Sequence, residues 1–234
     1  MLYQLTPFQE ILSRWNKQIA IPLEIHLIDE LLGGILPCHL QLVIGDSGAG
    51  KTLYCMKVIS QLLKRKPEAQ ILYSDFEGNF RINNLRKMLS DPSKLNQIVI
   101  FQPKSLLEQI VLFRNLVETS RYSYDLIILD SVFGSPLSCL AYFQKEQKLW
   151  EKRLFSHFLD LQLLARNSKI PILLTNHLIS TKKPESSSNQ FGEDLIRQFV
   201  PIEFFIQKIE QKQFLEVRVF QKLVGSSDFV LIPR

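Results

Sequence analysis

The clearest chemical signal in the sequence is a phosphate-binding loop. Eight consecutive residues satisfy the pattern G-x-x-x-x-G-K-[ST], and they are Gly45, Asp46, Ser47, Gly48, Ala49, Gly50, Lys51 and Thr52. Glycines let backbone N–H groups curl around a phosphate, and a helix that begins near Lys51 adds the partial positive charge of its N-terminus. In such a loop Lys51 reaches the β and γ phosphates, and the Thr52 hydroxyl binds Mg²⁺. We therefore expect these residues to bind a nucleoside triphosphate.

Two acidic residues stand at the ends of apolar runs, where a sheet would bring them to the phosphates. Asp130 ends one run, and we expect it to hold Mg²⁺ through water. Glu77 lies just beyond another run, and we expect its carboxylate to polarise the water that attacks the γ-phosphate. Lys51 and Glu77 are thus the predicted catalytic residues, and Thr52 and Asp130 are the predicted metal ligands.

A polar pair, Asn176 and His177, follows a further apolar run. Because the carboxyl ends of parallel strands meet at one edge of a sheet, this pair would lie beside the phosphate loop. We expect the two side chains to complete the γ-phosphate side of the site.

Short stretches rich in Val, Ile and Leu predict the strands that position these residues. Their near-continuous hydrophobicity is typical of parallel strands that helices cover on both faces. The predicted strands span residues 41–45, 71–75, 97–101, 125–130 and 170–175. Three later runs, at residues 201–209, 214–221 and 228–232, predict an antiparallel extension of the same sheet.

Amphipathic stretches between the strands predict helices. Residues 105–121 begin with a capping-box spacing, and their predicted apolar face consists of Leu106, Leu107, Ile110, Val111 and Val117. Residues 142–167 repeat apolar side chains at steps of three and four, which predicts a buried stripe of Trp150, Leu154, Phe158, Leu161 and Ala165. The alternation of strands and helices predicts an α/β fold with a mostly parallel central sheet flanked by helices.

Length and composition are those of a globular protein. The 234 residues suit one domain, and we expect an N-terminal extension at 1–20 and a single core domain at 21–234. No apolar run approaches ~18 residues, so no membrane partner is expected. The separated Cys38, Cys55 and Cys139 predict neither a disulfide framework nor a zinc site and favour a cytoplasmic location. The net charge of +5 is compatible with an anionic partner.

The order of these motifs along the chain resembles that of the RecA/Rad51 recombinase core. The phosphate loop is followed by D-F-E-G at 75–78, by the strand of Asp130, by a long helix and by T-N-H at 175–177. Upstream, the sequence L-I-D-E-L-L-G-G at 27–34 looks like the lead-in of that family. The resemblance covers residues 20–232 and favours archaeal RadB-type paralogs, with eukaryotic Rad51 paralogs as a near second choice.

The resemblance implies a RecA-like P-loop NTPase core that binds ATP and Mg²⁺ and hydrolyses ATP weakly, with modulation by DNA. It further implies an accessory or mediator role in homologous recombination and DNA repair. The implied partners are single-stranded DNA and either a full-length recombinase or another paralog. Lys182 and Lys183 lie where the family has its second DNA-binding loop, so they are the predicted DNA contacts. The implied location is the nucleoid, or the nucleus in a eukaryote.

Two positions depart from the family pattern. Asn84 stands where the family often has an arginine that stacks on adenine, so the adenine contact is unassigned. The nearest match to the protomer-docking motif F-x-x-A is Phe8 to Ile11, and Ile11 is too large for an alanine pocket. We therefore expect this chain not to build long filaments by itself.

Two other functions stay open on the sequence. A KaiC-like regulatory ATPase shares the same core, but it would carry adjacent acids after the second strand, whereas Gly78 follows Glu77 here. An interaction module would bind ATP as a structural ligand without hydrolysis. A nucleotide kinase is disfavoured because no arginine cluster follows Asp130. A GTPase is disfavoured because T-K-K-P at 181–184 ends in proline where guanine recognition needs aspartate.

Overall fold

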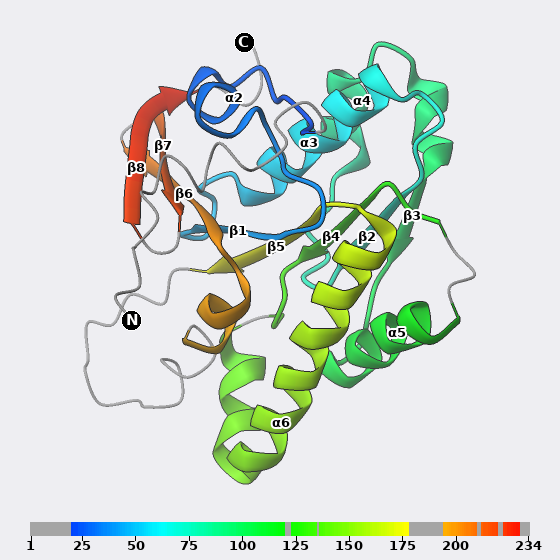
Figure 1. Ribbon diagram of the computed structural model, residues 1–234, viewed down its shortest axis with the longest axis vertical. Helices are drawn as coiled ribbons and strands as arrows, with labels where there is room; N and C mark the ends of the chain where they lie inside the picture. The colour runs from blue at the N-terminus through cyan, green and yellow to red at the C-terminus, as the bar shows by residue number, and fades with distance from the viewer. Residues whose placement is uncertain are drawn as a thin grey trace, which may run out of the picture.

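The computed structural model describes residues 20–119, 123–134, 136–177, 194–209, 212–219 and 222–229. Its central feature is one eight-stranded sheet with the strand order β3-β2-β4-β5-β1-β6-β7-β8 (Figure 1). Apart from Ala20, the extension predicted at residues 1–20 lies outside the described residues. The division of the chain into an extension and a core domain therefore stays a prediction.

Six neighbouring strands of the sheet run parallel to one another; β7 then pairs antiparallel with β6, and β8 pairs antiparallel with β7. This arrangement confirms the predicted α/β fold with a mostly parallel sheet and antiparallel strands near the C-terminus. The strands are β1 (Leu40–Gly45), β2 (Ile71–Asp75), β3 (Ile98–Phe101), β4 (Leu126–Asp130), β5 (Ile172–His177), β6 (Ile202–Ile209), β7 (Lys212–Val219) and β8 (Lys222–Phe229).

Three strand predictions need correction. β6 runs parallel to β1, so the antiparallel part begins only with β7. β5 extends to His177, which places the polar pair Asn176 and His177 inside the strand. The last strand was predicted to begin at residue 228, but β8 begins at Lys222. A Gly-Ser-Ser stretch at 225–227 has a weak intrinsic strand preference, and pairing with β7 overrides it.

Helices cover both faces of the sheet (Figure 1). On one face lie α2 (His26–Leu32), α3 (Lys51–Arg65) and α4 (Ile82–Met88), and on the other lie α5 (Leu106–Thr119) and α6 (Pro136–Ser168). The 3-10 helix η2 (Pro92–Gln97) leads into β3. Successive residues of a strand point to opposite faces of the sheet. Val43 of β1 packs in the hydrophobic cluster that contains α3, and Leu42 packs in the cluster that contains α6.

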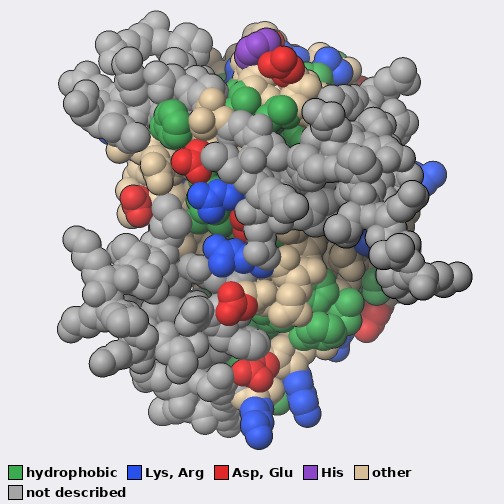
Figure 2. Space-filling view, turned by 60° about the vertical axis from the view of Figure 1, so that its left-hand side comes forward, with side chains coloured by type: hydrophobic (Ala, Val, Ile, Leu, Met, Phe, Trp, Pro, Cys, Tyr) green, Lys and Arg blue, Asp and Glu red, His purple; other side chains and the backbone are tan. Residues whose placement is uncertain are grey.

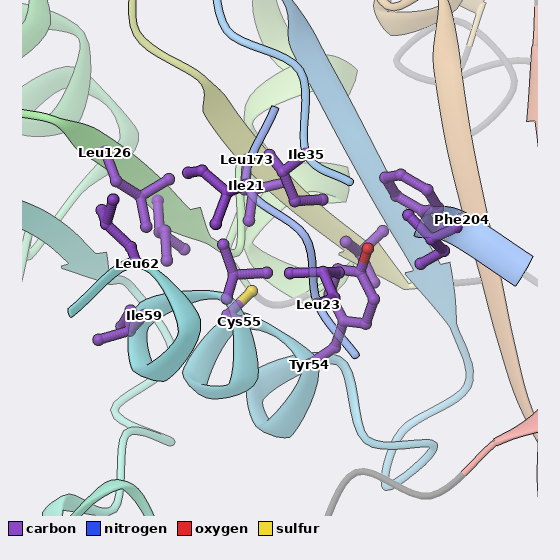
Figure 3. Close-up of a cluster of buried hydrophobic side chains, with 14 of the residues drawn as sticks. Ile21, Leu23, Ile35, Tyr54, Cys55, Ile59, Leu62, Leu126, Leu173 and Phe204 are labelled. Carbon is purple, nitrogen blue, oxygen red and sulfur yellow. The ribbon is translucent and has the colours of Figure 1, made fainter. Parts of the chain in front are cut away.

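The packing of α3 against the sheet fixes the position of the phosphate loop. Tyr54 and Ile59 of α3 are fully buried in a cluster that also contains Leu126, Leu173 and Phe204 from three strands (Figure 3). Because this helix begins where the phosphate loop ends, its buried face determines where the helix N-terminus lies.

The apolar face predicted for residues 105–121 is only partly right. Leu107 and Val111, which were predicted to face the core, are 45% and 48% exposed. Val117 packs partly buried against the core, as predicted. The buried positions of α5 are Leu106, Gln109, Ile110, Phe113 and Leu116. The error arose because Leu107 and Val111 share a helix face with each other but lie about 100° around the helix from Leu106 and Ile110.

The long helix α6 confirms its predicted stripe, whose five residues are all buried. The helix begins at Pro136, six residues before the predicted start. Neither α6 nor any other helix within the described ranges is long and apolar enough to cross a membrane.

Candidate nucleotide-binding site

The phosphate loop joins the end of β1 to the start of α3, as the motif predicts. Gly45 is the last residue of β1 and Lys51 is the first residue of α3. A Cβ atom on Gly45 would lie 2.3 Å from the carbonyl oxygen of Ile206, so only glycine fits there. Gly50 has a φ of 109°, which L side chains rarely adopt. The loop thus turns the N–H groups of the first turn of α3 toward the space at the sheet edge.

Lys51 is held inside the loop that precedes it. Its Nζ atom donates to the carbonyl oxygens of Gly45 at 2.8 Å and of Asp46 at 3.0 Å, and it lies 3.3 Å from Nδ1 of His177. Burial lowers the pKa of Lys51, while the nearby charges of Glu77 and Asp130 oppose that shift. The charges of these two carboxylates therefore favour the ammonium form of Lys51.

Asp130 is the last residue of β4, and its carboxylate accepts hydrogen bonds from hydroxyl groups of three other elements. Its Oδ2 atom accepts hydrogen bonds from Thr52 at 2.7 Å and from Tyr73 at 2.5 Å, and its Oδ1 atom accepts one from Thr175 at 2.5 Å. The carboxylate is only 4% exposed. These bonds fix the carboxylate beside the Thr52 hydroxyl, so the two predicted metal ligands are in direct contact.

Glu77 and His177 come together across the sheet edge. Oε1 of Glu77 lies 2.7 Å from Nε2 of His177, and Oε2 accepts a hydrogen bond from the Asn79 amide at 2.9 Å. Burial alone would raise the pKa of Glu77, but hydrogen bonds from His177 and Ser131 and the charge of Lys51 outweigh it, so the pKa is lowered. Glu77 is therefore a carboxylate at neutral pH.

The turn that presents Glu77 is held by the last residue of β2. The Asp75 carboxylate accepts hydrogen bonds from the backbone N–H of Asn79 at 2.9 Å and of Phe80 at 3.3 Å. These bonds close the turn between β2 and α4. Asp75 thereby sets the direction in which Glu77 leaves the sheet.

A cavity of about 300 Å³ joins these side chains. It is lined by Ser47, Gly48, Gly50, Lys51, Thr52, Leu53, Glu77, Asn79, Asn84, Asp130 and His177. Asn176 is not among the lining residues and is 7% exposed, so only His177 of the predicted pair faces the cavity. Lys182 and Lys183 lie outside the described residues.

The donor set fits Mg²⁺ in the way that nucleotide sites use it. No group of three or more His, Cys, Asp or Glu side chains in the described ranges is placed to hold a metal ion. Mg²⁺ commonly needs no such group, because one or two protein oxygens combine with phosphate oxygens and water. The Thr52 hydroxyl and the Asp130 carboxylate, which are hydrogen-bonded to each other, would supply these protein oxygens.

Sequence reasoning missed two residues that position Asp130. Tyr73 lies two residues before the end of β2, and Thr175 lies beside Asn176 in β5. Tyr73 shares a sheet face with Asp130 because it stands two residues before Asp75, which pairs with Asp130. Thr175 lies beside Asp130 because Leu174 pairs with Leu129. A polar side chain within an otherwise apolar strand was the available signal.

The fold and the site together define a RecA-like P-loop domain. The solved structure titled "Crystal structure of the RadB recombinase" has the same fold, with a TM-score of 0.66 and 20% sequence identity. The match covers 86% of this chain and 91% of that chain. No protein-family model matches the chain.

Sequence relatives identify the type within that class. The chain is 30% identical over 157 residues to the DNA repair and recombination protein RadB of Pyrococcus abyssi, a match that covers 64% of this chain and 63% of that protein. It is 24% identical over 174 residues to RadB of Methanobrevibacter smithii, with coverages of 74% and 73%. For RadB of Methanococcoides burtonii the identity is 28%, with coverages of 72% and 74%. The chain is therefore similar, over about two thirds to three quarters of its length, to RadB proteins.

Proposed function

We propose that the chain binds ATP with Mg²⁺, hydrolyses ATP slowly and acts as an accessory or mediator factor in homologous recombination and DNA repair. The main support is the convergence of Lys51, Thr52, Glu77, Asp130 and His177 around one cavity at the carboxyl edge of the sheet. The relatives named as DNA repair and recombination proteins support the recombination setting.

Nucleotide binding would use the loop and the start of α3. The N–H groups of residues 45–52 would surround the phosphates, and the Lys51 ammonium would contact the β and γ phosphates. Thr52 and Asp130 would hold Mg²⁺, which neutralises charge on the phosphates when it is bound.

Hydrolysis would use Glu77 as the general base. Its lowered pKa keeps the carboxylate ready to accept a proton from the water that attacks the γ-phosphate. His177 contacts Glu77 through one ring nitrogen and lies near Lys51 through the other. The base and the Lys51 ammonium are thereby linked through one imidazole, whereas Asn176, predicted to share this role, does not line the cavity.

The contacts of Glu77 also explain why hydrolysis would be slow. Both of its carboxylate oxygens have partners, His177 at Oε1 and Asn79 at Oε2. These partners would compete with the attacking water for the carboxylate lone pairs and so weaken its action as a base. The same contacts favour a second candidate function, an interaction module that binds ATP without hydrolysing it.

Two measurements on one preparation separate these functions. Titration calorimetry measures the affinity for ATP with Mg²⁺, and a phosphate-release assay measures turnover with and without single-stranded DNA. We expect binding together with slow release that DNA alters. Binding without release would favour the interaction module, and absence of binding would refute both functions.

The proposed protein partner is a full-length recombinase or another paralog. β3 ends the strand order, so one side of its backbone has no neighbouring strand among the described residues. Val99 and Ile100 of this strand are 46% and 41% exposed. An exposed apolar edge strand suits pairing with a strand of another protein. We therefore place the partner at the β3 edge in this proposal.

Single-stranded DNA is the other proposed partner. On the face shown in Figure 2, described basic side chains are interspersed with acidic ones, so they form no uniform basic patch there. The DNA proposal accordingly rests on Lys182 and Lys183, which follow the site in the sequence.

The double substitution Lys182→Ala and Lys183→Ala tests this assignment. It should weaken DNA binding and flatten the log-log salt slope by ~0.7 for each lost phosphate contact. Fluorescence anisotropy with labelled single-stranded DNA at several salt concentrations measures both quantities. ATP affinity should stay unchanged, and an unchanged DNA affinity and slope would remove the two lysines from the DNA site.

A further inference from the structure

A second cavity lies at the edge of the sheet opposite the phosphate loop. Its volume is about 230 Å³, and its lining includes Cys38 and His39 before β1, Gln162 and Arg166 of α6, and the segment 197–201 before β6. The six residues of β1 separate this cavity from the phosphate loop, a distance of about 17 Å along the strand. The cavity is therefore distinct from the nucleotide site.

The polar lining of this cavity favours an anion. Arg166 and Arg197 contribute guanidinium groups, and Gln162 and Gln198 contribute amides. The lining residues, all within the described ranges, include no aspartate or glutamate. Arg166 is exposed and forms no ion pair with the described residues. A cation at this surface without an acidic neighbour in the lining attracts anions from solution.

Buried neighbours set the direction of two lining side chains. Glu203 of β6 is 2% exposed, and its Oε1 atom accepts a hydrogen bond from Nε of Arg197 at 3.4 Å. That contact orients the guanidinium group at the cavity. The ring of His39 is likewise oriented, because its Nδ1 atom lies 2.7 Å from the carbonyl oxygen of Pro37. The cavity therefore has polar groups whose positions do not depend on a ligand.

We propose that this cavity binds a phosphate group. Guanidinium groups present paired donors that match phosphate oxygens, and glutamine amides add further donors. Cavities for whole small-molecule ligands measure about 300–1,000 Å³, so this smaller cavity suits a phosphate ion or one phosphate of a larger molecule. The group comes either from a small phosphate compound or from a nucleic acid backbone, since the same donors recognise both.

Cys38 provides a readout specific to this cavity. It lines the cavity and is half-buried, whereas Cys55 is fully buried in the core. Alkylation of Cys38 by iodoacetamide, followed by peptide mass spectrometry, reports whether the cavity is occupied. When pyrophosphate or a single-stranded oligonucleotide is present at ten times its Kd, the alkylation rate of Cys38 should fall about tenfold. The reason is that only about one protein molecule in ten then has no ligand in the cavity.

Three variants locate the protection. Because the phosphate loop also binds pyrophosphate, the titration is repeated with Lys51→Ala. Arg166→Glu reverses the charge of an exposed side chain at the cavity. Lys104→Glu makes the same change in net charge at an exposed residue beyond β3, at the other edge of the sheet. We expect protection of Cys38 to survive Lys51→Ala and Lys104→Glu and to be lost in Arg166→Glu.

Each outcome decides between the sources or against the site. If the oligonucleotide protects Cys38 and this protection is lost in Arg166→Glu, the cavity binds a nucleic acid backbone. If only pyrophosphate protects Cys38, the cavity binds a small phosphate compound. The proposal is overturned if neither compound slows alkylation of Cys38, or if protection persists in Arg166→Glu. None of these outcomes depends on ATP binding, so failure here leaves the proposed function intact.

Discussion

His177 and His157 lie in two regions that surround the imidazole ring with different groups. At the carboxyl edge of the sheet, His177 has Glu77 at one ring nitrogen and Lys51 near the other. His157 of α6 is fully buried beside Phe113 of α5, and neither of its ring nitrogens has a hydrogen-bond partner among the described residues. The first region is a network of paired polar groups, and the second is an apolar layer that contains an unpaired imidazole.

The difference shows that hydrogen-bond partners and nearby charges can outweigh burial in deciding whether an ionisable group stays charged. Burial of His157 lowers its pKa to about 3, and the charge of Arg114 adds to that shift. Burial also disfavours the charged form of Glu77, yet its hydrogen-bond partners and Lys51 reverse the outcome. The carboxyl edge therefore keeps charges available for chemistry, whereas the α5–α6 layer keeps its imidazole neutral.

The substitution Glu77→Gln should have the largest effect. It keeps the shape of the side chain but removes the carboxylate that we propose as the acceptor of the proton from water. Turnover should fall by ~10² or more, the usual contribution of a general base. Steady-state phosphate release measures the rate, and titration calorimetry should find ATP binding retained. An unchanged rate would show that another residue is the base.

The unpaired imidazole of His157 should make stability depend on pH. Below pH ~6.5 the unfolded chain gains a proton at this residue, while the folded chain stays neutral there until the pH nears 3. Stability is therefore lost as the pH falls through that range, by about 2 to 3 kcal/mol between pH 7 and pH 4.5. In His157→Leu this acid-dependent loss of stability should disappear, as measured by urea unfolding at several pH values.

A matched control for His157 lies on α2. His26 is exposed and ion-paired with Glu30, so His26→Gln should keep the acid sensitivity of the parent protein. Equal pH dependence in the parent protein and in His157→Leu would mean that the imidazole has partners in solution.

Lys51→Ala should weaken ATP binding about ten- to hundredfold. The ammonium would make charge-assisted hydrogen bonds to phosphates, each worth about 1.5 to 3 kcal/mol. Titration calorimetry with ATP and Mg²⁺ measures the loss, and circular dichroism should show an unchanged fold. An ATP affinity equal to that of the parent protein would reject the assignment of the nucleotide site.

The sequence predicts the carboxyl edge well because its chemistry depends on spacing. The phosphate loop must follow a strand and precede a helix, and β1 and α3 obey that order. Glu77 and Asp130 are found at strand ends because parallel strands finish at one edge. Their contacts with His177 and Thr52 follow from that shared edge.

Other features have no spacing signal in the sequence. The partners Tyr73 and Thr175 of Asp130 depend on strand register, which becomes known only when the order of strands is known. Arg166 and Arg197 are 31 positions apart, and only the packing of α6 near the start of β6 brings them to one cavity. The sequence therefore could not predict these contacts between distant elements.

The smallest predicted effect concerns the outer face of the apolar layer. Leu106 and Leu107 are neighbours in α5, yet Leu106 is fully buried and Leu107 is 45% exposed. Leu106→Ala should cost about 2 to 5 kcal/mol, because it removes buried atoms and leaves a cavity. Leu107→Ala should change the free energy of unfolding by no more than about 0.5 kcal/mol, as measured by urea unfolding with an unchanged m value. The two substitutions remove the same atoms from adjacent positions, so any difference between them measures burial alone. Equal losses would mean that Leu107 is covered in solution and that the buried layer extends beyond the face of α5 described here.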